Sequence, residues 1–175
     1  DRSTHCLAVY NNALYAAGYI GMAGGVTVSN IAKWDGTNWS ALGSGLNDYV
    51  QSLGVFNNEL YASGPFTTAG GIGVNGIAKW NGSNWSAVGS GLNGTANAFV
   101  VFNNELYVGG EFSTAGGIAA KNIAKWNGTS WSAVGNGFNT YWINCITTHK
   151  NDFYVAGDFA MAGDIPIHCI AKLEL

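Results

Sequence analysis

Charged residues are unusually scarce in this chain of 175 residues. Charged residues make up 10% of it, well below the roughly one quarter typical of soluble domains. Only seven Lys and Arg stand against ten Asp and Glu. Because a phosphate-binding surface needs clustered positive charge, we expect no nucleic-acid partner. The chain also lacks helical periodicity and any apolar run long enough for a membrane-spanning helix, so we expect no membrane insertion.

Cysteine is scarce too, and its spacing excludes familiar metal and redox sites. The three cysteines form neither a zinc-site spacing nor a C-x-x-C motif, so we expect no cofactor. Cys145 occupies the repeat position of Leu7 and Leu53, which predicts a small core side chain. Cys6 and Cys169 lie near opposite ends of the chain. They form a candidate disulfide if those ends are neighbours in a ring and strand geometry allows it.

Catalytic patterns are absent as well. None of the three histidines, His5, His149 and His168, recurs along the chain or has a Ser or Cys at a spacing that indicates a nucleophile pair. We therefore expect no catalytic residues, no metal site and no enzymatic activity.

What the chain does contain is a repeat. The tetrapeptide Ile-Ala-Lys-Trp begins at Ile31, Ile77 and Ile123, 46 residues apart each time, and a copy ending in Leu begins at Ile170. Self-similarity at this interval is typical of propeller blades. We divide the chain, as one β-propeller domain, into the repeats 1–48, 49–94, 95–140 and 141–175.

Each repeat indicates four short strands. In the second repeat, apolar runs at 52–56 and 59–63 flank Asn57-Asn58, and Asn tolerates the positive φ of tight hairpins. A Gly-rich loop follows. Two more runs then flank Asn81-Gly82, and Asn-Gly between apolar runs is a strong hairpin signal. The sequence predicts an all-β fold, a small β-propeller of four blades. The fourth repeat ends where this second turn would fall, so the last blade lacks its outer strand and 15 strands are expected.

The repeat resembles kelch-type repeats such as those of the galactose-oxidase central domain. It is most similar to the W-[DN]-G-x-x-W-S-A-[LV]-G repeats of secreted bacterial and fungal cell-surface proteins. It departs from kelch proper because the Gly-Gly doublet after the second strand appears only at Gly109-Gly110. The resemblance implies a propeller. It does not imply copper chemistry, because no matching ligand cluster is present, and propellers host many functions.

The truncated last blade leaves an unpaired edge at Ile170, Ala171, Lys172 and Leu173. Open edges template pairing with another chain. Four alternatives stand: a tolerated outer edge, a contact with a neighbouring subunit in a polymer, a fragment of a longer propeller, or two chains that share one ring. Sparse charge provides little repulsion against association. The favoured hypothesis is therefore a non-catalytic structural module that self-assembles into an oligomer or filament.

The repeated tryptophans support a rival hypothesis. Trp39, Trp85 and Trp131 each follow the second turn and are flanked by Asn or Ser. Such rings could stack on sugars, as in a multivalent propeller lectin with carbohydrate as partner; the alternative is that they wedge between blades. Trp142 breaks the repeat, which indicates an exposed position or an interface.

Two further expectations concern charge and location. Lys33, Lys79, Lys125 and Lys172 recur before the Trp position, and acids recur at Glu59, Glu105 and Asp152, which predicts pairing from blade to blade. Low charge and loops rich in Asn, Ser and Thr favour a secreted or cell-surface protein. The N-terminus shows neither an initiator Met nor a signal-peptide core, which predicts a removed leader or an excised piece.

Overall fold

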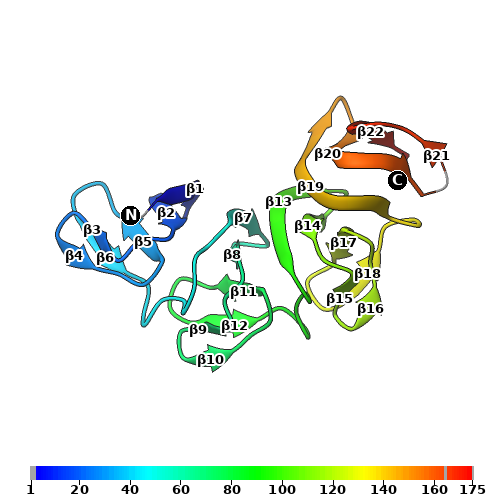
Figure 1. Cartoon of the computed structure of the whole chain (residues 1–175). Helices are drawn as coiled ribbons and strands as arrows, with labels where there is room; N and C mark the ends of the chain where they lie inside the picture. The colour runs from blue at the N-terminus through cyan, green and yellow to red at the C-terminus, as the bar shows by residue number, and fades with distance from the viewer. Residues whose placement is uncertain (1–2, 164, 175) are drawn as a thin grey trace. The chain divides into compact units, whose positions relative to one another are not determined.

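The computed structural model describes residues 3–163 and 165–174, and in these the chain forms strands and turns without helices. It follows that none of this part of the chain forms an apolar helix of membrane-spanning length. Four antiparallel sheets follow one another along the sequence (Figure 1), one from each repeat. The fold is therefore all-β and built from repeated four-stranded sheets, as the sequence predicts.

The first three sheets share one strand order, in which the third strand of the repeat lies between the second and the fourth. Their strands are β1 Thr4–Tyr10, β2 Ala13–Gly18, β5 Ile31–Trp34 and β6 Trp39–Ala41; β7 Ser52–Phe56, β8 Glu59–Ser63, β11 Ile77–Trp80 and β12 Trp85–Ala87; and β13 Thr95–Phe102, β14 Glu105–Glu111, β17 Ile123–Trp126 and β18 Trp131–Ala133. The fourth sheet contains β19 Phe138–His149, β20 Asp152–Ala162 and β22 Ile170–Leu173. All 15 expected strands are present.

The Gly-rich loop between the second and third strands of each repeat is more ordered than the sequence indicates. In the first three repeats it folds into a two-residue hairpin: β3 Met22–Ala23 with β4 Val26–Thr27, β9 Thr68–Ala69 with β10 Ile72–Gly73, and β15 Thr114–Ala115 with β16 Ile118–Ala119. In the fourth repeat β20 extends into this arm and pairs with β21, Ile165–Pro166. Such short arms lack the alternation of a longer strand, which is why the pattern indicates only a loop.

The predicted turns are confirmed by the backbone. Asn57 and Asn58 have φ of 47° and 56°, so both central residues of the β7–β8 hairpin are left-handed, as a type I′ turn requires. Lys150 and Asn151 do the same in the fourth repeat. At the second turn Gly82 has φ of 103°, a value that a side chain would disfavour.

The chain forms two compact units, residues 1–91 and 92–175, and each contains two repeats. In the first unit one apolar core joins Tyr15 and Ile31 of the first repeat to Leu60 and Trp80 of the second. In the second unit Ile123 of the third repeat shares a core with Phe153 of the fourth. Consecutive repeats within a unit are thus held together by common apolar packing.

Candidate functional site

The most unusual feature of the described residues is the outer edge of β22. One side of this strand pairs with β20, in a register that places Ala171 opposite Val155 and Leu173 opposite Phe153. The other side has no strand partner within residues 3–163 and 165–174. This is the edge that the sequence predicts at Ile170 to Leu173.

The four side chains of the edge differ in exposure. Ala171 is buried, Leu173 is half-buried, and Ile170 is 60% exposed. Lys172 is held by an ion pair, because its Nζ lies 2.8 Å from Oδ1 of Asp152 on the neighbouring strand. This contact raises the pKa of Lys172 and lowers that of Asp152. The edge therefore presents unpaired backbone and a large apolar side chain rather than free charge.

The fourth repeat has Leu173 where the others have Trp, and an aromatic residue on the neighbouring strand replaces the lost ring. In the first three sheets the Trp that ends the third strand pairs with a Leu of the second strand, as Trp126 pairs with Leu106. In the fourth sheet the aromatic residue is on the second strand and the aliphatic residue on the third, because Leu173 pairs with Phe153. The Phe153 ring lies 4.7 Å from that of Tyr107 in the preceding repeat. Phe153 thus makes an aromatic contact between the third and fourth repeats.

The candidate sugar-stacking tryptophans are packed against the protein. Trp85 and Trp131 are 6% and 8% exposed, and Trp39 is half-buried. A Cβ built on Gly70 would lie 2.9 Å from Cδ1 of Trp85, so this ring rests on the glycine turn of its own repeat. The indole nitrogen of Trp85 also donates to the carbonyl of Leu42, 3.2 Å away in the preceding repeat. These contacts favour the alternative in which the tryptophans wedge between repeats.

The recurring charges pair within one sheet, and the expected blade-to-blade pairing is wrong. Lys79 contacts Glu59 and Lys125 contacts Glu105, both at 2.7 Å between Nζ and Oε2. The partners lie on adjacent strands in diagonal positions, because Tyr61 and Tyr107 lie directly opposite Lys79 and Lys125. Long side chains reach such diagonal neighbours, and opposite charges attract there. The bond to Glu105 raises the pKa of Lys125. In the first repeat the acidic position is Ala13, so Lys33 has no acid there.

None of the three cysteines is bonded to another within the described residues. Cys6 is half-buried, and burial raises its pKa to about 12, while its Sγ lies 3.8 Å from the carbonyl oxygen of Ala17. Cys145 of β19 is exposed, so its expected place in the core is wrong. The pairing of Cys6 with Cys169 stays a prediction.

The first of the three histidines, His5, is fixed by hydrogen bonds. His5 is bound on both ring nitrogens, to Ser3 Oγ at 2.9 Å and to the carbonyl of Val50 at 3.1 Å. Within the described part of the chain, no three His, Cys, Asp or Glu side chains lie close enough to hold a metal ion.

Trp142 is 40% exposed, which is one of the two outcomes expected for a residue that breaks the repeat.

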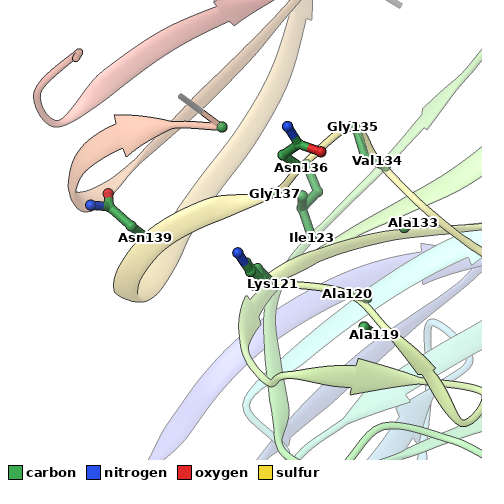
Figure 2. Close-up of a pocket in the computed structure, with 11 residues that line it drawn as sticks. Ala119, Ala120, Lys121, Ile123, Ala133, Val134, Gly135, Asn136, Gly137 and Asn139 are labelled. Atoms are coloured by element: carbon green, nitrogen blue, oxygen red, sulfur yellow. The ribbon is translucent and has the colours of Figure 1, made fainter. Parts of the chain in front are cut away.

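A pocket in the second unit lies where the loop before β17 approaches the loop before β19 (Figure 2). It encloses about 340 Å³, and its polar side chains are those of Lys121, Asn136 and Asn139. Figure 2 shows these three side chains at separate places around the pocket, with the backbone of Gly137 between Asn136 and the other two. The described lining holds one cation and two carboxamides but no carboxylate, so it offers no acid–base pair.

A second kind of pocket recurs at the same place in the first and third repeats, beside Asn30 and Asn122. Its lining changes between the two copies, because Tyr19 and Ser29 of the first repeat correspond to Glu111 and Lys121 of the third. A ligand site present once per repeat would need the same side chains in each copy. These pockets therefore share a backbone shape without sharing a binding chemistry.

One important position escaped the sequence analysis. Gly24, Gly70 and Gly116 each support the Trp of their own repeat, and Gly163 holds the corresponding place in the fourth repeat with φ of 58°. The sequence does contain a signal, because this glycine recurs in every repeat. In the fourth repeat the glycine is shifted by one position, because that repeat has one additional residue before it.

Comparisons with known proteins find the fold and nothing more. No family model matches the chain, and no curated protein does. Among solved structures, the computationally designed Ika4 protein is similar with a TM-score of 0.61 and 13% identity, over 98% of this chain and 90% of that one. The computationally designed Ika8 protein is similar with a TM-score of 0.56 and 14% identity, over 90% of this chain and 43% of that one. At such identities the likeness concerns architecture alone.

Proposed function

We propose that this chain is a non-catalytic interaction module that self-associates through the open edge of β22. The observation that carries the proposal is the exposure of Ile170. Its counterparts Ile31, Ile77 and Ile123 are fully buried, whereas Ile170 is 60% exposed beside an unpaired strand. An apolar side chain next to free backbone donors and acceptors is a template for pairing with a further chain.

We further propose that the four sheets are the blades of a small propeller. Each repeat forms its own antiparallel sheet, and consecutive repeats within each unit share an apolar core. Packing face to face is how blades are held in such folds. The kelch-like resemblance of the repeat supports the same arrangement, and low charge supports a secreted or cell-surface setting.

The absence of an enzymatic role is part of the proposal. It is supported by the way the recurring polar residues are used: the lysines and acids pair within sheets, and the asparagines stabilise turns. The glycan-binding alternative receives less support. A ring that is 6% or 8% exposed has no open face on which a sugar could stack.

The native mass of the protein tests self-association. We expect size-exclusion chromatography with light scattering to give a defined multiple of 18.3 kDa, or filaments by electron microscopy. Ile170→Lys should return the protein to a monomer. Ile165→Lys is the matched control, because Ile165 is 67% exposed in the same repeat but lies outside β22. A wild-type monomer across the accessible concentrations would contradict the proposal.

A further inference from the structure

The first three sheets show what normally covers the edge that β22 leaves open. In each of them the third strand has a short Trp-Ser-Ala strand on its outer side. The register is the same each time: the Ala of the third strand lies opposite the Ala of Trp-Ser-Ala, and the terminal Trp lies opposite its Trp, as Trp80 lies opposite Trp85. Three copies of one pairing thus show which kind of strand fits the outer side of β22.

The residues after this strand belong to the same apolar cores as the buried counterparts of Ile170. Ile31 shares a core with Leu42 and Leu46, which follow β6. Ile123 likewise shares a core with Val134 and Phe138, which follow β18. The segment that packs there is therefore longer than the strand. It has the pattern Trp-Ser-Ala-Z-Gly-x-Gly-Z-Asn, where Z is Leu, Val or Phe. Its copies are 39–47, 85–93 and 131–139.

The fourth repeat also keeps the platform on which the Trp of this segment rests. Gly116 is left-handed, and a Cβ there would lie 2.5 Å from Cδ1 of Trp131. Gly163 is left-handed in the same way, but a Cβ there would meet only Asn136, at 3.5 Å. The backbone around it is retained, because the Gly163 amide donates to the carbonyl of Gly137 at 2.7 Å, as the Gly70 amide donates to Gly45.

We infer that the edge of β22 is a docking site for an extended segment of a partner polypeptide with this nonapeptide pattern. The segment adds as an antiparallel strand, with its Ala opposite Ala171, its Ser opposite Lys172 and its Trp opposite Leu173 and over Gly163. Its later apolar residues cover Ile170. Backbone pairing gives affinity in such strand addition, and the side-chain pockets give specificity. The inference rests on the proposed role of this edge in interaction, but it names a different partner from a second copy.

A synthetic peptide tests the docking directly. The probe is a fluorescein-labelled copy of residues 36–47, titrated with the whole chain and followed by fluorescence anisotropy. We expect saturable binding, and at least tenfold weaker binding when the peptide carries Trp39→Ala. Ile170→Lys in the protein should weaken binding by a similar factor, while Ile165→Lys should leave it unchanged. Bound peptide should also slow hydrogen exchange at amides of β22.

A second variant separates docking from folding. Gly163→Asn keeps a residue type that tolerates positive φ but places a side chain where the indole must lie. It should weaken peptide binding at least tenfold with an unchanged circular dichroism spectrum. Equal affinity for the peptides with Trp and Ala, or for wild type and Ile170→Lys, would overturn the inference.

The two proposals fail separately. Self-association that Ile170→Lys abolishes, without any binding of the peptide, overturns the docking inference and leaves the proposed function standing. Binding of the peptide by a protein that remains an 18.3 kDa monomer supports docking and overturns self-association.

Discussion

Trp85 and Leu42 join the first two repeats through one hydrogen bond, from the indole nitrogen to the backbone carbonyl over 3.2 Å. The two residues are 43 positions apart, and the bond is buried. The Trp thus fills space and also satisfies a backbone acceptor of the neighbouring repeat. Buried carbonyls that lose such a partner are destabilising.

Trp85→Phe is expected to lower the free energy of unfolding by about 1 kcal/mol or more, because it removes the donor and leaves the Leu42 carbonyl buried. Urea unfolding followed by circular dichroism measures the loss. Trp39→Phe is the control, because Trp39 is half-buried and should lose less. Equal losses for the two variants would show that the hydrogen bond is unimportant.

The glycine turn beneath Trp131 offers a sharper comparison. Gly116→Ala adds a methyl group against the indole at a left-handed residue, and it should destabilise by roughly 2–4 kcal/mol. Gly117 is also left-handed, but a Cβ there meets nothing within 4 Å, so Gly117→Ala should cost only about 1 kcal/mol. The difference between their chemical-denaturation midpoints isolates the contact with the indole. If the two midpoints coincide, the Trp does not rest on the glycine.

In the reduced protein the three thiols should react at very different rates. Burial raises the pKa of Cys6 to about 12, so at pH 8 only about one thiol in ten thousand is the reactive thiolate. Cys145 and Cys169 are exposed. We expect iodoacetamide to modify these two quickly in the native protein and Cys6 only after unfolding, as read by mass spectrometry of peptides. Fast native labelling of Cys6 would contradict its burial.

We expect Asp35 to make the free energy of unfolding decrease as the pH becomes acidic. Its carboxylate accepts hydrogen bonds from the backbone N–H groups of Asn38 and Thr37, both at 2.8 Å, and these lower its pKa. A carboxyl whose pKa is lower in the folded state stabilises the fold above its unfolded pKa of about 4, and this stabilisation is lost as the pH falls through the folded value.

Asp35→Asn tests this without removing the turn, because Asn fills the position in the second and third repeats and accepts the same bonds. The melting temperature of wild type minus that of the variant should decrease between pH 6 and pH 2. A difference independent of pH would mean that the Asp35 charge is not coupled to folding.

Much of the fold could be predicted because its determinants are local. Asn57-Asn58 and Asn81-Gly82 fix two hairpins through their own backbone preferences, and the Ile-Ala-Lys-Trp copies fix the interval. The open edge followed from counting strands. None of this required knowledge of which side chains meet.

What could not be predicted depends on contacts across strands. A recurring Lys and Glu indicate a pair, but the sequence does not show whether the partner lies in the same sheet, as Lys79 and Glu59 do. Leu173 and Phe153 exchange the strands that carry the aromatic and the aliphatic residue, and that the two lie opposite each other is visible only in the register. Cys145 follows the hydrophobic positions of the earlier repeats, yet the sheet leaves it exposed.

The strand pairs of each sheet join residues that are close in sequence, and among the described residues the most widely separated pair is Phe138 with Ala162. Long all-β chains usually fold slowly because distant segments must meet before they are stabilised. Here each sheet closes only short loops, so folding can begin in any repeat and spread to its neighbour. The chain should therefore refold faster than a β-sandwich of its size, and the sheet whose outer edge is unpaired should be the first to exchange its amide hydrogens.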